Sequence, residues 1–269
     1  MPVEQLNGTP ISYEVTGEGE PLVLVHGAWV DLHSWGLVAP GLSQSFKVVA
    51  YDLRGHGQST LDDATSGTVH DDIADLAALV THLGIAPVTV FGVSSGACIA
   101  LRFAAEHPEL VLRVIAQEPP IDSLLRAAPD AGALAEQDRL DREAVRGLIE
   151  QGKHRDAAEH FVEHIAIGPG AWASFPPPVQ DTFERHAEAF LGQTNDPDAV
   201  EVDLEALSSS SVPVVLTRGD QSPAIFTPIM DELERRLPNA QTHTFIGAGH
   251  VPSMTHPAEL ITAIRYLAR

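Results

Sequence analysis

The sequence contains a single cysteine, Cys98, so no disulfide bond can form within the chain. Small and apolar residues surround it in the segment Ala97–Leu101, a setting typical of a buried thiol on a helix. The cysteine count therefore excludes a disulfide-stapled scaffold and is compatible with a reducing compartment.

Basic residues are also scarce, since 16 Lys and Arg stand against 37 Asp and Glu and give a formal net charge of −21. This excess of acid argues against nucleic acids and anionic membranes as partners, and it disfavours strongly anionic substrates. No apolar run reaches transmembrane length, and residues 1–20 lack the charged and apolar regions of a secretion signal. We therefore expect a cytoplasmic protein with a small-molecule substrate; composition leaves monomer and homodimer both open.

Aromatic residues make up only 6% of the 269 positions, but 44% of the residues are hydrophobic, enough for one large core and a subsidiary lobe. Apolar strand patterns alternate with helical ones along much of the chain. Strands are expected at 11–15, 22–25, 46–51, 88–91, 111–117 and 212–219, and helices at 69–83 and 95–106. This alternation predicts an α/β protein whose mostly parallel sheet is flanked by helices, with active groups at the carboxyl ends of the strands.

The strand pattern stops between residues 121 and 207, where acidic, Ala-rich helical stretches are broken by Gly- and Pro-rich turns. This predicts a helical cap at 121–207 inserted into a core domain formed by 1–120 and 208–269. Because the cap leaves and re-enters the core next to strand ends, it can roof the functional site. Trp172 and Phe175 in the cap, with Trp29 in the core, are the candidate walls of a substrate pocket, and simple packing of cap on core is the alternative reading.

The most informative segment is Gly92-Val93-Ser94-Ser95-Gly96, which follows an apolar strand and opens a helix of small residues. This is the pattern of a nucleophile elbow, a strained strand-to-helix turn that exposes a serine hydroxyl. Gly92 and Gly96 are needed there because a side chain at either position would collide with the closely approaching backbone. Ser94 is therefore the candidate nucleophile.

A serine nucleophile also requires an oxyanion hole. The apolar strand at 21–25 ends in His26-Gly27, which opens a loop able to direct the Ala28 N–H at the site. Ser95 supplies a second N–H at the start of the following helix, where the helix dipole favours developing negative charge.

The general base is chosen among 13 histidines by position. His250 lies on a glycine-rich loop after a strand, late in the chain, as the order Ser–acid–His requires. His26 and His56 lie in Gly-rich loops at strand ends and are assigned to orienting those loops, in which Asp52 and Arg54 act as braces. Six others in polar contexts are interpreted as solvated: His33, His70, His82, His107, His243 and His256.

Two residues compete for the role of the acid that orients His250. Asp220 ends the strand at 212–219, but the position three residues after its glycine, where the acid commonly lies, is Ser222. Glu118 follows the preceding strand directly before Pro119-Pro120. Both strand ends can face the same imidazole, and the additional methylene of Glu gives it more reach. We favour Glu118 and keep Asp220 as the alternative.

A metal site is a further alternative, because His160-Phe161-Val162-Glu163-His164 has the His-x-x-Glu-His spacing of one class of zinc peptidases. Its acidic helical surroundings favour a solvated face, and the serine constellation accounts for the other motifs without a metal. We therefore expect no metal and no cofactor.

These motifs, together with the Gly-rich loop Asp52–Ser59, resemble the α/β-hydrolase superfamily over nearly the whole chain. Within it, the elbow, the Glu118–Pro120 turn, the absence of the usual later acid and His250–Pro252 are similar to the zearalenone lactonases. Those enzymes open a resorcylic macrolactone and take their acid from the strand before the cap. The resemblance implies a triad of Ser94, Glu118 and His250, although His26-Gly27 follows the general hydrolase form.

The predicted reaction is hydrolysis of a carboxylic ester or lactone through an acyl-enzyme on Ser94. Relatives in the superfamily use the same constellation for cofactor-free perhydrolysis or for carbon–carbon bond cleavage. Others bind a hormone-like ligand without turning it over. Both readings stay open at this point.

Overall fold

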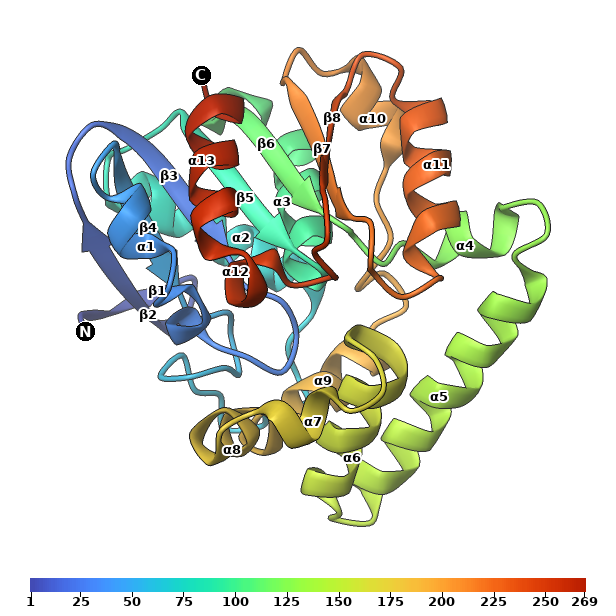
Figure 1. The fold of residues 1–269 in the computed structure, drawn as a ribbon. Helices are drawn as coiled ribbons and strands as arrows, with labels where there is room; N and C mark the ends of the chain where they lie inside the picture. Colours follow the sequence, from blue (N-terminus) through green and yellow to red (C-terminus); the bar gives the residue numbers. More distant parts are fainter.

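The computed structural model describes residues 1–269 as an eight-stranded sheet with the order β1-β2-β4-β3-β5-β6-β7-β8 (Figure 1). β1 pairs with β2 and β2 with β4 in antiparallel fashion, and all remaining pairs are parallel. The strands are β1 (Val3–Leu6), β2 (Thr9–Thr16), β3 (Glu20–Val25), β4 (Phe46–Tyr51), β5 (Val88–Val93), β6 (Val111–Gln117), β7 (Val214–Gly219) and β8 (Gln241–Phe245). The predicted α/β class with a mostly parallel sheet is confirmed.

The first strand is additional to those expected from the sequence. Three of the four residues of β1 are exposed, so the segment has no apolar alternation that would indicate a strand. By contrast, all six residues of β5 are buried, because a central parallel strand is covered on both faces.

Alternate residues of the strands enter two separate hydrophobic cores, one on each face of the sheet. Helices α1 (Ala39–Leu42) and α13 (Pro257–Leu267), with the 3₁₀ turn η1 (Leu32–Trp35), cover one face. Helices α2 (Val69–His82), α3 (Ser95–Glu106) and α11 (Phe226–Arg236) cover the other. Figure 1 shows α13 in front of the central strands and α3 behind them.

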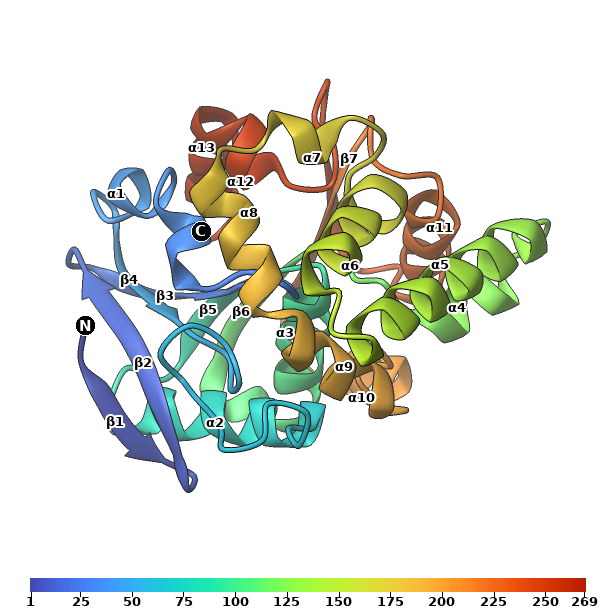
Figure 2. The same ribbon diagram turned by 90° about the horizontal axis from the view of Figure 1, so that it is seen from below.

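The cap is a helical layer that lies beyond the carboxyl ends of the strands, and Figure 2 shows it from below with its long first helix reaching away from the core. It contains α5 (Gly132–Glu150), α6 (His154–Phe161), the π-helical turn η3 (Val162–Ala166), α7 (Ala171–Ser174), α8 (Pro177–Arg185) and α9 (Ala187–Asn195). These elements share a hydrophobic cluster of their own, into which Trp29 of the core inserts.

Two short helices at the ends of the expected cap belong to the core by their packing. Apolar residues of α4 (Asp122–Ala127) and α10 (Leu204–Ser209) join the cluster formed by α2, α3 and α11. The separate hydrophobic cluster of the cap draws on elements from α5 to α9, inside the range 121–207.

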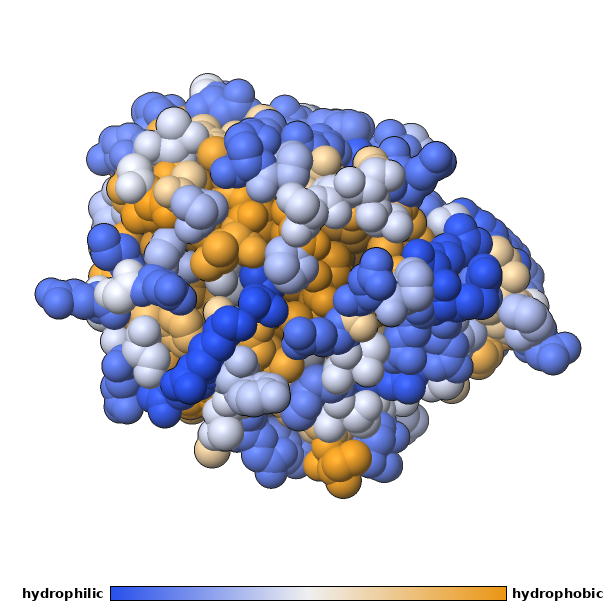
Figure 3. All heavy atoms as spheres, turned by 90° about the horizontal axis from the view of Figure 1, so that it is seen from above, coloured by the Kyte–Doolittle hydropathy of each residue, from blue (hydrophilic) through white to orange (hydrophobic).

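The remaining elements are η2 (Pro108–Leu110) and α12 (Pro252–Thr255), which precede β6 and α13. Cys98 is buried in α3, and burial raises the pKa of its thiol, as expected for a packing residue. None of the helices combines the length and apolarity needed to span a bilayer. The end of the molecule away from the cap shows apolar residues between hydrophilic ones (Figure 3).

Candidate active site

Ser94 connects β5 directly to α3 in a backbone conformation that few residues adopt. Its φ of 56° and ψ of −127° lie outside the regions normally populated by L-residues with a side chain. The Ser94 N–H donates a 2.9 Å hydrogen bond to the carbonyl of Gln117, the last residue of β6. The neighbouring strand therefore holds the turn in its strained form.

The two glycines of the elbow are required by close backbone contacts, as the sequence predicts. A Cβ at Gly92 would lie 2.1 Å from the carbonyl oxygen of Gly96, and a Cβ at Gly96 would lie 2.3 Å from that of His26. Gly27 faces the elbow from the loop after β3, and an added Cβ there would be 3.2 Å from Ser94 Cβ. Any larger residue would push the strand, the helix or the preceding loop away from the serine.

Ala28 and Ser95 border the same cavity as Ser94. Ser95 is the first residue of α3, and the first N–H groups of a helix have no partner within the helix. Ala28 lies on the loop after β3, brought close by the contact at Gly27. The two residues predicted as oxyanion donors thus line the same cavity as the half-buried serine.

Glu118 and His250 form a buried pair, with Glu118 0% and His250 2% exposed. The His250 Nδ1–H donates to Glu118 Oε2 over 2.8 Å. Glu118 also accepts from the Gly219 N–H at Oε1, over 2.8 Å, and from the Ser222 hydroxyl at Oε2, over 2.9 Å. A carboxylate with three donors is well compensated for its burial.

The imidazole is held by further contacts. Its ring stacks on Phe226, with centroids 4.1 Å apart and planes 14° from parallel. The amide of Gln117 donates to the His250 carbonyl over 3.5 Å. His250 and Ser94 line one cavity without a direct hydrogen bond between them; such bonds are often long in hydrolases without a bound substrate.

Asp220 has a different environment. It is exposed, and its Oδ1 accepts the Gly247 N–H over 2.7 Å, at the start of the loop that leads to His250. The structure therefore brings Glu118, and not Asp220, to the imidazole. Ser222, at the position where the acid commonly lies, supports Glu118 through its hydroxyl.

The cavity at Ser94 is small, about 20 Å³, room for about one water molecule. Its walls are formed by both domains, and the full set is Ala28, Ser94, Ser95, Pro120, Arg142, Phe161, Ile165, Ala166, Phe190, Gln193, Val200, Ile225, Phe226 and His250. In this closed arrangement a substrate larger than water requires the cap or the Ile225–Phe226 segment to move.

The three aromatic residues predicted to line a pocket lie elsewhere. Trp29 is fully buried and stacks on Phe161, with centroids 5.1 Å apart, so it joins the core to the cap. Trp172 and Phe175 pack around Phe183 within the hydrophobic cluster of the cap. None of the three borders the Ser94 cavity, because the cap helices turn their aromatic faces toward one another.

His26 and His56 brace the loops around the site, as the sequence indicates. His26 Nδ1–H donates to the Gly27 carbonyl over 2.8 Å, while its Nε2 accepts the Leu53 N–H over 3.0 Å. Asp52, expected to brace the same loop, accepts from the N–H groups of Leu32 and Gln58. Arg54, in contrast, reaches away to pair with the carboxylate of Asp75 over 2.8 Å.

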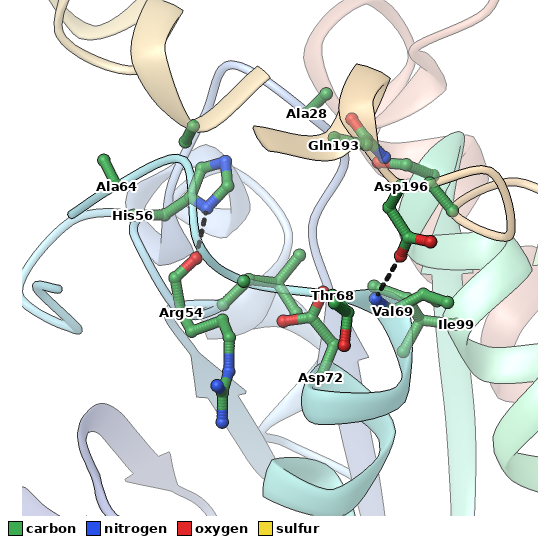
Figure 4. Close-up of a pocket in the computed structure, with 15 residues that line it drawn as sticks. Ala28, Arg54, His56, Ala64, Thr68, Val69, Asp72, Ile99, Gln193 and Asp196 are labelled. Carbon is green, nitrogen blue, oxygen red and sulfur yellow. Dashed lines mark hydrogen bonds between the residues drawn. The ribbon is translucent and has the colours of Figure 1, made fainter. Parts of the chain in front are cut away.

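A second cavity of about 40 Å³ lies on the other side of Ala28 and Ser95 (Figure 4). It has room for water, and two polar atoms in its walls, His56 Nε2 and Asp72 Oδ1, have no hydrogen-bond partner. Burial lowers the pKa of His56 and raises the pKa of Asp72, which favours the neutral form of each.

The residues of the His-x-x-Glu-His motif are engaged in contacts within the cap. His160 Nε2 lies 3.0 Å from Asp141 Oδ1, and the Glu163 carboxylate accepts the N–H groups of Gly170 and Trp172. The structure contains no group of three or more His, Cys, Asp or Glu side chains arranged to hold a metal ion.

Residues 20–257 match the model of a family described as having the alpha/beta hydrolase fold. The chain belongs to this α/β-hydrolase family. The matched range spans residues 94, 118 and 250 and the helical segment between β6 and β7.

Individual relatives are similar over different shares of the chain. An uncharacterised hydrolase of Bacillus subtilis is 40% identical over 125 residues, which are 45% of this α/β hydrolase and 45% of that protein. The chain spans less than half the length of the curated relatives it matches.

Solved structures of α/β hydrolases align over nearly the whole chain. A thermophilic esterase from Thermogutta terrifontis has a TM-score of 0.73 and 28% identity, covering 97% of this chain and 93% of the esterase. An enol-lactonase from Burkholderia xenovorans has a TM-score of 0.80, 20% identity and full coverage of both chains, a likeness of fold.

Sequence reasoning missed four residues that surround the site. Phe226 stacks on His250, and Ile225, Arg142 and Gln193 border the Ser94 cavity. Nothing in their local sequence marks them, because each lies on an amphipathic helix or at its start, where such residues are ordinary.

Proposed function

We propose that this protein is a serine hydrolase that cleaves a carboxylic ester or lactone through an acyl-enzyme on Ser94. The observation that carries the proposal is the buried Glu118–His250 pair, with a 2.8 Å hydrogen bond, beside a serine in the elbow conformation. An activated serine needs a base near its hydroxyl and an acid that orients the base, and we assign these roles to His250, which lines the same cavity as Ser94, and to Glu118.

In the first half-reaction His250 removes the Ser94 hydroxyl proton while Oγ attacks the substrate carbonyl carbon. The tetrahedral oxyanion accepts hydrogen bonds from the N–H groups of Ala28 and Ser95. When the intermediate collapses, the bond to the leaving alcohol breaks, and His250 donates the proton to the alcohol oxygen. Glu118 stabilises the imidazolium that forms between these two steps.

In the second half-reaction His250 removes a proton from a water molecule, which attacks the acyl-enzyme. The acid product leaves, and the proton returns to Ser94 Oγ. The chemistry uses side chains and backbone groups of this chain alone. The 28% identical Thermogutta protein, an esterase by name, supports an ester as the substrate class.

The specific candidate substrate is a zearalenone-type macrolactone, because the acid at the end of β6 and the elbow follow the lactonase pattern. The cavity of about 20 Å³ at Ser94 means that such a ring enters after the cap has moved away from the core. A small aryl ester needs much less displacement. Hydrolysis of the aryl ester therefore tests the mechanism, and hydrolysis of the macrolactone tests the substrate specificity.

The test is mass spectrometry of zearalenone and of an aryl acetate after incubation with the wild-type protein, using Ser94→Ala as the blank. Ring opening that depends on Ser94 assigns a macrolactone hydrolase. Ser94-dependent turnover of the aryl ester alone supports an esterase for smaller substrates. Near wild-type turnover by Ser94→Ala would contradict the proposed mechanism.

A further inference from the structure

Arg142, on the cap helix α5, is the one permanently charged side chain among the 14 residues that border the Ser94 cavity. The other walls are neutral apart from the titratable His250, and eight of them are hydrophobic. A cation in such surroundings has lost much of its hydration, so it attracts an anion more strongly than an exposed arginine does.

The guanidinium is fixed on one side and free on the other. Its Nε–H donates to Asp138 Oδ2 over 2.7 Å, and the Asp138 side chain is only 5% exposed. Neither terminal nitrogen of Arg142 donates a hydrogen bond to the protein. Burial opposes the charge, but Asp138 and Asp122 outweigh it and raise the pKa of Arg142, so the side chain stays protonated.

A third cavity, of about 670 Å³ and called the large cavity below, meets the Ser94 cavity at Arg142. It lies between α5 and the segment 190–201, and it shares Arg142, Phe190, Gln193 and Val200 with the smaller cavity. Its volume is that of a typical small-molecule site. Arg142 and Gln193 are thus the polar groups between a ligand-sized space and the nucleophile.

The other three arginines of the large cavity differ from Arg142. Two of them use their terminal nitrogens in ion pairs, and the third is more exposed. Arg126 contacts Asp122 and Glu201, and Arg139 contacts Glu136 and Glu143. Arg146, one helical turn from Arg142, pairs with Glu150. It borders the large cavity but not the Ser94 cavity. Arg142 is therefore the guanidinium positioned to receive a group from a molecule that also reaches Ser94.

We infer that Arg142 binds a carboxylate of the substrate, so that the substrate is an ester or lactone carrying one carboxylate group near the scissile carbonyl. A guanidinium with free terminal nitrogens matches the two oxygens of a carboxylate. The Gln193 amide, which has no hydrogen-bond partner in the protein, supplies a further donor. This inference rests on the proposed hydrolase function of Ser94. It specifies an ester or lactone with a carboxylate in place of zearalenone, which carries none.

The net charge of −21 is consistent with one carboxylate and not with a polyanion. The repulsive field of the molecule opposes every added negative charge, and Arg142, already paired with Asp138 through Nε–H, has free donors for one carboxylate. Composition disfavours strongly anionic substrates. The positive charge of Arg142 allows a substrate with a single carboxylate.

The test compares monomethyl esters of succinic, glutaric and adipic acid with the methyl esters of butanoic, pentanoic and hexanoic acid. Each pair differs by a terminal carboxylate in place of a methyl group. We expect wild-type kcat/KM to favour the carboxylate form by about tenfold or more in at least one pair. Arg142→Gln should remove that preference, measured as the ratio of kcat/KM between the two members of each pair.

Arg146→Gln is the matched control, because it removes an arginine from the same helix and the same large cavity without touching the Ser94 cavity. It should keep the wild-type preference. Arg142→Lys retains the positive charge and should keep part of the preference for the carboxylate ester. If Arg142→Gln unfolds because Asp138 is left unpaired, the double variant Asp138→Asn/Arg142→Gln removes both charges and serves in its place.

The outcomes separate the inference from the proposed function. Ser94-dependent hydrolysis with no carboxylate preference, or a preference that persists in Arg142→Gln, would overturn the inference alone. If no ester is hydrolysed in a Ser94-dependent manner, the proposed function is contradicted, and calorimetric titration with hexanoate, which carries one carboxylate, then tests the site. Hexanoate binding that is lost in Arg142→Gln would support a carboxylate site, and no binding to the wild type would refute it.

Discussion

Glu118 illustrates how a single side chain acquires its position from several elements. Its backbone has a φ of 46°, and its N–H donates to Thr217 of β7 over 3.1 Å. Its two oxygens accept from Gly219, Ser222 and His250. Because β6, β7 and the loop after β8 all contribute, the carboxylate is oriented before any substrate binds.

At this scale we expect Glu118→Gln to lower kcat by about 10³-fold or more, because the amide offers His250 the wrong hydrogen-bonding pattern and no charge for the imidazolium. Asp220→Asn should stay within a few-fold of wild type, since the Asp220 carboxylate accepts from the Gly247 N–H and the Gln221 amide and does not contact His250. Steady-state hydrolysis of an aryl acetate measures both variants. The reverse ranking would transfer the role of the acid to Asp220.

The element that determines the site is the strand-turn-helix unit formed by β5, Ser94 and α3. Its turn is tight because the backbone of α3 passes within van der Waals contact of β5 and of the loop after β3. Strain at the serine is thus maintained by close packing around two residues without side chains.

We expect Gly92→Ala to lower the free energy of unfolding by about 2 kcal/mol or more, because its Cβ would lie 2.1 Å from a backbone oxygen that no rotamer change can move. Gly147→Ala, in the interior of α5 with open space around the added methyl, is the control. It should raise stability by about 0.5–1 kcal/mol. Urea denaturation measures both, and equal effects would contradict the close approach.

At the scale of the whole molecule, the cap is tied to the core by Trp29 and His186. His186, between α8 and α9, accepts the Gly57 N–H at Nε2 over 3.0 Å and lies with Nδ1 3.3 Å from the Trp29 carbonyl. Its ring lies 5.1 Å from that of His56, which in turn lies 5.2 Å from His26. Three imidazoles therefore share the junction of the two domains.

Burial lowers the pKa of all three imidazoles below the ordinary value of 6.5. In the window between the lowered values and 6.5 the unfolded chain binds more protons than the folded one, so stability rises with pH there. It is fully present above about pH 6.5 and is lost on acidification, by up to about 1.4 kcal/mol per pH unit for each histidine.

We therefore expect the free energy of unfolding to fall as the pH is lowered from 7 toward 5. His56→Gln, which removes one buried titrating group, should reduce the slope relative to wild type. Urea denaturation at a series of pH values measures this, with His82→Gln on the outer end of α2 as a control that keeps the wild-type slope. Identical slopes in wild type and His56→Gln would refute the contribution of this junction.

Local sequence was sufficient for the elements and for the turn at Ser94. The strand at 46–51 and the helix at 95–106 have the bounds expected from their apolar periodicity. The strand lies within the sheet, and the apolar residues of the helix pack against it. The glycines at 92 and 96 indicated the elbow because the geometry of that turn excludes side chains. β1, which has three exposed residues out of four, carries no such pattern and escaped prediction.

The sequence by itself determined the sheet, the nucleophile and the order of the catalytic candidates, since these depend on periodicity and on sterics within a few residues. Only the tertiary structure decided which acid faces His250, because Glu118 and Asp220 end neighbouring strands and differ in the direction of their side chains. It alone placed Trp172 and Phe175 away from Ser94 and brought Arg142 to it. Those positions depend on how the cap packs across the sheet, a contact between residues far apart in the chain.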